Sequence, residues 1–280
     1  MNILYSHIKL FRPLNVFISA MAMVIASAIL GALHEINIVI LVIAVVICYT
    51  SAANSLNDFL DAEIDLINRP LRPIPSGNVT KNTALVLSIL LFIFGTLLCL
   101  ELSKLARVIG ILIAMPLMVV YSKYLKGLPL IGNMTIALIL GLSFLFCGAA
   151  FGKIESMWIP MLLAFGLTFV RELIKDIADI EGDKSAGLRT FPITAGVNRA
   201  IQVTIFLSAC IGIGSFVPFL NGSYGMWYAI ILILGIEIPL GLVVVSLLNK
   251  PEVLSAAQGA RILKFSTIMG LIAIYAGTFS

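Results

Sequence analysis

The sequence predicts an all-α membrane protein with nine helices crossing the bilayer. Sixty per cent of its 280 residues are hydrophobic, only 11% are charged, and the mean hydropathy is +1.11. Soluble domains carry about 25% charged residues. A bilayer core of about 30 Å needs roughly 20 apolar residues per helix. Measured against that length, the chain holds nine apolar segments, at 14–33, 36–56, 83–102, 106–121, 131–150, 157–171, 200–220, 226–248 and 262–278.

Some of the nine segments depart from a regular span in their length or in the residues they contain. Residues 26–28 resemble a signal-peptidase site, but they lie inside a 20-residue apolar run that is too long for a signal core, so 14–33 is predicted to be a retained span. The fourth and sixth segments are short, and the sixth is expected to continue as helix into the polar stretch behind it. The four cysteines lie in four different spans without a CxxC pair, which predicts buried small apolar residues rather than a redox or metal role.

The basic residues predict the orientation in the membrane. With nine spans, the amino terminus and the loops after spans 2, 4, 6 and 8 share one side, which holds 15 of the 18 Lys and Arg residues. Basic residues accumulate on the cytoplasmic side, so we expect a multi-pass cell-membrane protein with that side in the cytoplasm. The net charge of +4 is then a consequence of topology. No nucleic-acid partner is expected, and no obligate protein partner is evident.

Two polar loops interrupt an otherwise apolar chain, at 57–82 and 172–199, and we expect one membrane domain over 1–280 in which these loops carry the chemistry. All six aspartates lie in them, in two triplets of identical spacing, and the second triplet follows the first by 118 residues. We call the triplets the first acidic motif (Asp58, Asp61, Asp65) and the second acidic motif (Asp176, Asp179, Asp183).

The spacing of each motif indicates a metal site. On a continuous α-helix, offsets of three and seven residues fall within an arc of about 60°, and carboxylates gathered on one face repel one another unless cations share the site. A single triplet is also typical of a solvated helix end, but two copies that use every Asp favour a site. Mg²⁺ is held by one or two carboxylates, with phosphate oxygens and water completing its octahedron. A diphosphate would need two such ions and nearby cations.

The first loop is predicted to begin as a helix that extends span 2 to about Asn68. The three prolines between 70 and 75 forbid further helix, so a stiff extended segment should follow until Thr80 or Asn82 caps span 3. Asn54 lies four residues before Asp58, on the carboxylate face.

In the second loop, Glu172 takes the position equivalent to Asn54, and Gly182 is expected to end the helix within the motif. Cations flank both loops, and Tyr121 and Lys126 lie where span 4 meets the same aqueous side. Each cation is equally explained as a membrane anchor, and Tyr121 with Lys126 as an interfacial aromatic and a snorkelling lysine. Glu237, an acid inside the eighth span, is a functional candidate by its position.

The strings Asn57-Asp58-x-x-Asp61-x-x-x-Asp65 and Asp176-x-x-Asp179-x-x-x-Asp183 resemble the motifs that follow helices 2 and 6 in the UbiA family of intramembrane prenyltransferases. The resemblance covers the whole chain. It implies nine helices around a central cavity that opens laterally to lipid and is capped by the two loops. One departure is the family's Y-x-x-x-K pattern after helix 4, because Tyr121 and Lys126 are one residue further apart.

Within the family, the strings at 12–15, 68–77 and 171–183 look most like those of archaeal-type digeranylgeranylglyceryl phosphate synthases, although the last string also occurs in quinone and chlorophyll branches. This likeness implies transfer of a geranylgeranyl group from its diphosphate to the hydroxyl of geranylgeranylglyceryl phosphate, for ether-lipid synthesis. One alternative is an aromatic acceptor, as in quinone biosynthesis. Another is a cation-coupled transporter, although transporters place their acids near the midplane and here the acids gather at one rim.

The resemblance also implies residue roles. All six aspartates are expected to be catalytic, and the partners are a prenyl diphosphate, a lipid phosphate acceptor and membrane lipid. The principal Mg²⁺ ligands would be Asp58, Asp61, Asp179 and Asp183, with Asn54, Asp65 and Asp176 in support. Substrate contacts are expected from Arg12, Asn15, Asn54, Asn57, Arg72, Tyr121, Lys126, Lys175 and Arg189.

Overall fold

The computed structural model describes residues 3–250 and 252–279, and these residues form helices and connecting turns without a β-strand. The chain divides into two compact units. The first comprises Met1–Lys126 and Leu142–Met157, and the second comprises Gly127–Gly141 and Trp158–Ser280. Helix α8 (Ile131–Ala150) therefore gives its first half to the second unit and its second half to the first.

The predicted membrane class is confirmed. Within the described residues, eight helical segments are long and apolar enough to cross a bilayer, and the helix at Pro13–Ile29 is apolar with 17 residues, the lower limit for a span. The last span begins nine residues earlier than predicted, because the helix continues through the small and polar residues that precede the apolar segment, among them Ser255, Gln258 and Arg261. The eight segments are Ile36–Leu60, Lys81–Cys99, Lys104–Leu125, Ile131–Ala150, Ile154–Ala178, Val197–Leu220, Met226–Asn249 and Val253–Ala276.

Large apolar side chains are exposed in the middle of these segments. Leu112 is 68% exposed, Phe206 66% and Ile213 75%. Leaving such side chains in water would cost about 1.5–3 kcal/mol each relative to burial. Contact with lipid would remove that cost, so these exposed apolar side chains indicate helix faces that lie against the bilayer.

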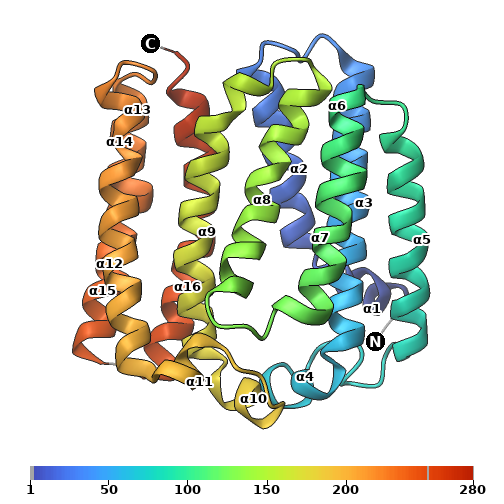
Figure 1. Ribbon diagram of the computed structural model, residues 1–280, viewed down its shortest axis with the longest axis vertical. Coiled ribbons are helices and arrows are strands. Elements are labelled where there is room, and N and C mark those ends of the chain that lie inside the picture. Colours follow the sequence, from blue (N-terminus) through green and yellow to red (C-terminus); the bar gives the residue numbers. More distant parts are fainter. Residues whose placement is uncertain (1–2, 251, 280) are drawn as a thin grey trace. The chain divides into compact units, whose positions relative to one another are not determined.

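In the first unit, α3 packs against both α2 and α5 (Figure 1). The approach of α5 depends on Gly95, where a Cβ atom would lie 2.8 Å from the ring of Tyr49. The helices of this unit besides α8 are α1 (Ile3–Leu10), α2 (Pro13–Ile29), α3 (Ile36–Leu60), α4 (Ala62–Asn68), α5 (Lys81–Cys99), α6 (Lys104–Arg107) and α7 (Met115–Val120), with π-helical segments Val108–Ala114 and Tyr121–Leu125 and a 3₁₀ turn Ile154–Met157.

The first polar loop differs from its prediction in two respects. The helix reaches Asn68 as expected, but it breaks between α3 and α4 at Asp61. The proline segment is not extended: the Ser76 N–H donates to the Arg72 carbonyl at 3.0 Å and the Val79 N–H to the Pro73 carbonyl at 3.0 Å. Proline cannot donate a hydrogen bond, but its carbonyl accepts one, so turns form here. Of the two predicted caps, Thr80 is the one that caps α5, where its side chain accepts from the Thr83 N–H.

In the second unit, α9 packs against α16 and α12 around fully buried aliphatic side chains, among them Val170, Ile174 and Leu263. Its helices besides α8 are α9 (Trp158–Ala178), α10 (Ile180–Ser185), α11 (Phe191–Ala195), α12 (Val197–Ser215), α13 (Val217–Leu220), α14 (Met226–Leu232), α15 (Ile238–Asn249) and α16 (Val253–Ala276), with a π-helical segment Ile233–Glu237.

The second polar loop also corrects an expectation. The sixth span continues as helix to Ala178, as predicted, and the chain then breaks at Asp179. Gly182 lies inside α10 and does not end the helix. The turn falls at Gly187, whose φ of +71° is accessible to glycine at little cost.

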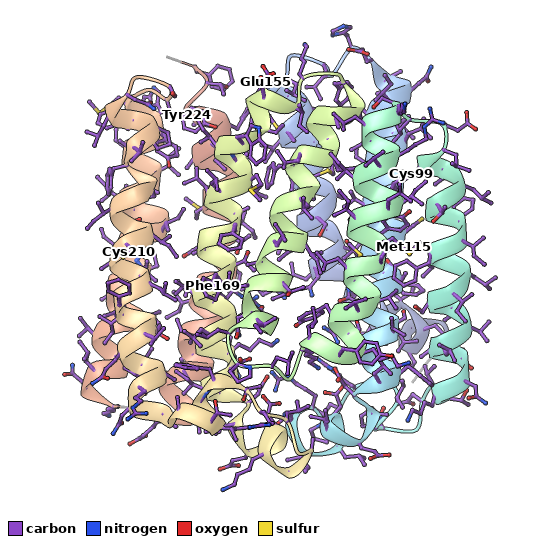
Figure 2. The ribbon with its side chains drawn as sticks, viewed as in Figure 1. Cys99, Met115, Glu155, Phe169, Cys210 and Tyr224 are labelled. Atoms are coloured by element: carbon purple, nitrogen blue, oxygen red, sulfur yellow. The ribbon has the colours of Figure 1, made fainter. Side chains whose placement is uncertain are left out.

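Three of the four cysteines are buried, as predicted. Cys210 is exposed on α12 (Figure 2), so the prediction of burial was wrong there. Apolar periodicity along a membrane helix does not distinguish a packed face from a lipid-facing one.

Candidate functional site

Both acidic motifs share one backbone form. The middle aspartate of each lies between two helices, with φ and ψ of −89° and 7° at Asp61 and −99° and 8° at Asp179. These angles belong to the sparsely populated bridge region. The third aspartate still donates its N–H to the carbonyl of the middle one, at 2.8 Å in the first motif and 3.0 Å in the second. The repeated sequence spacing thus produces a repeated bend instead of a straight stripe.

The first acidic motif is buried and neutralised by cations. Asp58 is 1% exposed, Asp61 5% and Asp65 4%. Arg72 contacts both Asp65 and Asp58, the latter at 3.3 Å. Burial raises the pKa of Asp65, although the Arg72 guanidinium opposes that shift. Buried carboxylates are tolerated when each is paired, and here every member of the motif has a cationic partner.

Arg12 supplies a second cation to this cluster. Its Nη2 lies 2.5 Å from Asp58 Oδ1, and its backbone is in the left-handed region with φ of 53°, which is rare for a residue with a side chain. Asn54 donates its amide to the Phe11 carbonyl at 2.9 Å, and Asn15 donates its backbone N–H to the Arg12 carbonyl at 2.8 Å. Asn54 thereby anchors the segment that carries Arg12.

Lys126 supplies the third cation, and a π-helical segment explains how it reaches the motif. Lys126 Nζ contacts the Asp61 carboxylate. Residues Tyr121–Leu125 are π-helical, and the Lys126 N–H donates to the Tyr121 carbonyl at 2.9 Å, a bond five residues long. A π-helical turn accommodates one extra residue, often at a functional site. The longer Tyr121-to-Lys126 spacing is therefore absorbed locally, and Tyr121 itself is buried.

Next to the second acidic motif, the carboxylate of Glu172 is paired with two cations. The Glu172 carboxylate accepts from Arg171 at 2.5 Å and from Lys175 at 3.0 Å. Lys175, a predicted substrate contact, is thus in contact with Glu172, for which no binding role was predicted. Asp183 is buried, with 8% of its surface exposed.

Two contacts from the segment after span 4 reach the residues around this motif. Asn133 Nδ2 donates to Asp176 Oδ2 at 2.8 Å. The backbone N–H of Arg189, an exposed residue, donates to the Gly127 carbonyl at 3.1 Å. Sequence reasoning missed Asn133, and the available signal was a polar amide at the aqueous end of an apolar span.

The donors of the first motif fit Mg²⁺. Across residues 3–250 and 252–279, no three acidic, His or Cys side chains gather as a complete protein ligand set. Mg²⁺ does not require one, because it retains water and phosphate oxygens beside one or two carboxylates. In addition, the amide oxygen of Asn57 is buried without a hydrogen-bond partner beside Asp58, and a neutral oxygen of this kind is a suitable ligand.

Glu237 has a structural partner within the second unit. It ends the π-helical segment Ile233–Glu237 and accepts from Ser215 Oγ at 3.0 Å. Gly212 leaves room for the carboxylate, since a Cβ there would lie 2.6 Å from Glu237 Oε2. A functional role for this acid stays a prediction.

Known proteins resemble the chain over its whole length. A digeranylgeranylglyceryl phosphate synthase from Methanopyrus kandleri is 34% identical over 274 residues, which cover 97% of this chain and 98% of that protein. A solved structure described as giving insights into digeranylgeranylglyceryl phosphate synthase in membranes is 30% identical, with a TM-score of 0.78 and 99% of both chains covered.

A more distant fold match is the structure of a UbiA homologue from Archaeoglobus fulgidus bound to DMAPP and Mg²⁺. It is 18% identical with a TM-score of 0.64, covering 96% of this chain and 99% of that one. A sequence profile of the UbiA prenyltransferase family matches residues 15–267. The bent aspartate motifs, the membrane helices and this match lead to one conclusion: the chain belongs to the UbiA prenyltransferase family.

Proposed function

We propose that the protein transfers a geranylgeranyl group from geranylgeranyl diphosphate to the free hydroxyl of geranylgeranylglyceryl phosphate in a Mg²⁺-dependent reaction. The observation that carries this proposal is full-length similarity to digeranylgeranylglyceryl phosphate synthases, at 34% identity in the example from Methanopyrus kandleri. The Mg²⁺ and prenyl diphosphate bound by the Archaeoglobus fulgidus homologue support the metal and the donor class.

The proposed reaction exchanges one carbon–oxygen bond for another. The bond between the prenyl C1 and the diphosphate breaks, leaving an allylic cation and a diphosphate that carries the bonding electrons. The acceptor hydroxyl oxygen attacks C1 and forms the ether bond, and its proton passes to the diphosphate or to an aspartate. When bound, Mg²⁺ stabilises the negative charge on the departing diphosphate, an effect worth several kcal/mol.

The protein's own side chains have defined parts in this proposal. Two Mg²⁺ ions would be held mainly by Asp58 and Asp61 in the first motif and by Asp179 and Asp183 in the second, with Asn54, Asp65 and Asp176 in support. Arg12, Arg72 and Lys126 already lie against the first motif. An arriving diphosphate would share these cations with the carboxylates. Arg72, Lys126, Lys175 and Arg189 are the candidates for contacting the diphosphate or the acceptor phosphate.

The proposed setting is the cytoplasmic rim of the membrane. The C20 chains of donor and acceptor have no reason to leave the bilayer, so only their phosphate ends need to meet the polar loops. The excess of Lys and Arg on the side of both loops supports a cytoplasmic active site.

The acceptor assay tests this proposal. Purified protein with Mg²⁺ and labelled geranylgeranyl diphosphate should form product with geranylgeranylglyceryl phosphate, and EDTA should stop the reaction until Mg²⁺ is restored. Product with an aromatic acid and none with the glyceryl phosphate would overturn the acceptor assignment. Cation flux in liposomes without any prenyl transfer would favour a transporter instead.

Substitution of the aspartates tests the metal assignment. Asp58→Asn and Asp179→Asn should each lower the transfer rate at least about 100-fold, because a loss of roughly 2.7 kcal/mol of transition-state stabilisation has that effect. Glu63→Gln is the matched control, since Glu63 lies inside the first motif's sequence but is exposed. Near-normal turnover by either aspartate variant would contradict the assignment.

A further inference from the structure

Asn133 is a buried polar residue whose contact is directed at the second acidic motif. It is 5% exposed, it lies in the first turn of α8, and its Nδ2 is 2.8 Å from Asp176 Oδ2 on α9. Both residues belong to the second compact unit. The contact joins residues 43 positions apart, so helix periodicity does not account for it.

The same helix shows how a buried polar side chain is satisfied without such a contact. Thr135 is 8% exposed, and its hydroxyl donates to the carbonyl of Ile131 in its own helix at 2.7 Å. Hydroxyl groups commonly bond to the preceding turn in this way. Asn133 instead donates to the carboxyl group of Asp176 on another helix, so its hydrogen bond joins two helices.

The backbone before α8 gives an independent indication. Among the described residues, only Arg12 and Leu130 combine a positive φ with a side chain other than that of glycine, at 53° and 59°. Such conformations are costly and concentrate at functional sites. Arg12 contacts Asp58 of the first motif, and Leu130 stands three residues before Asn133. In each unit a residue with a positive φ therefore stands at the start of a helix, and either that residue or one three positions later contacts an acidic motif.

We propose that Asn133 is a positioning residue of the second acidic motif, which fixes the Asp176 carboxylate through one hydrogen bond from the start of α8. The hydrogen bond to Oδ2 of Asp176 restricts rotation of the carboxyl group, so its other oxygen, Oδ1, keeps one orientation toward a ligand. Hydrogen bonds of this kind behind ligand-bearing carboxylates change metal affinity or activity about 10- to 100-fold when they are removed. The inference rests on the proposed function, because it assigns Asp176 to the diphosphate and metal site.

The experiment measures metal binding directly. Mn²⁺ is titrated into the purified full-length protein in detergent with inorganic diphosphate, and binding is followed by electron paramagnetic resonance. Asn133→Leu, which has a similar volume but no donor, should weaken Mn²⁺ binding about 10- to 100-fold. Thr135→Val, equally buried on the same helix, should bind like the wild type. Asn133→Ser is a second variant, for use if Asn133→Leu does not fold. The serine side chain is smaller than that of asparagine and its hydroxyl is too short to reach Asp176, so this variant should weaken Mn²⁺ binding in the same way.

A double-mutant cycle separates positioning from a general packing defect. If Asn133 acts through Asp176, Asn133→Leu combined with Asp176→Ala should bind Mn²⁺ no more weakly than Asp176→Ala alone. Additive losses, or wild-type affinity in both Asn133 variants, would overturn the inference while leaving the proposed function intact. A wild-type protein that neither binds Mn²⁺ nor transfers the prenyl group would instead defeat the proposed function.

Discussion

At the scale of single residues, Arg72 is the cation shared by two members of the first acidic motif. It contacts Asp65 and Asp58, both nearly fully buried. Removing one partner from a buried ion pair leaves an uncompensated charge and costs about 3–5 kcal/mol. Arg72→Met should lower the free energy of unfolding by about that amount, measured by equilibrium unfolding in detergent without Mg²⁺.

Arg72→Lys should fall between the wild type and Arg72→Met, because lysine keeps the charge but lacks the planar fork that serves two carboxylates. Arg199→Met is the control, since Arg199 is exposed at the start of α12. Equal unfolding free energies for Arg72→Met and Arg199→Met would show that the ion pairs of the first motif contribute nothing to stability.

The residues of the candidate site were predicted from the chain, but the contacts between them were not. The six aspartates were identified from their spacing, Arg72 from its place in the first polar loop, and Arg12 and Lys126 from their places at the ends of spans 1 and 4 on the same side of the membrane. The contacts from Arg12 to Asp58 and from Lys126 to Asp61 join residues 46 and 65 positions apart. No local pattern encodes such distances, which is also why Asn133 was missed.

At the scale of elements, the π-helical segment Tyr121–Leu125 holds one residue more than a regular helix would. Deleting Lys123, an exposed residue within it, should restore α-helical geometry while Lys126 keeps its approach to Asp61. We expect the deletion variant to keep transfer activity within about tenfold of the wild type, since the deletion removes the local irregularity that a π-bulge represents.

Deletion of Val45 from the middle of α3 is the comparison. It has no π-helical turn to absorb it and would rotate every later residue of α3, including Asp58, by about 100°. Activity and thermal unfolding of both purified variants give the readout. If the Lys123 deletion is as damaging as the Val45 deletion, the π-helical segment is not an insertion that the fold accommodates.

The composition of the chain predicted which segments are helical, but it did not predict where those helices break. The bends at Asp61 and Asp179 keep much of the local hydrogen bonding, so neither glycine nor proline marks them in the sequence. Gly182 did suggest a break, at the wrong residue. The turns between Pro73 and Val79 form because a proline carbonyl still accepts a hydrogen bond. The prediction of an extended segment considered only that proline lacks an N–H donor.

At the scale of the whole molecule, the charge distribution makes a prediction about topology. In a cysteine-free background, Ser185→Cys, next to the second motif, should react with an impermeant maleimide in inside-out vesicles but not in right-side-out vesicles. Ser223→Cys, in the loop after the seventh span, should show the opposite pattern. Both serines are in turns or helix ends, and Ser223 is exposed. Labelling of both cysteines from one side would overturn the assignment of nine spans.

The sequence by itself determined the membrane class and the approximate spans and predicted the residues of the candidate site, because hydrophobic length, charge bias and aspartate spacing are local properties of the chain. The tertiary structure decided which cation neutralises which carboxylate, where the helices bend, and that Asn133 reaches Asp176. These are contacts between segments distant in the chain, and they depend on how helices pack. Packing depends on the shapes of the side chains, and a helix face that packs against another helix has the same hydropathy as one that faces lipid.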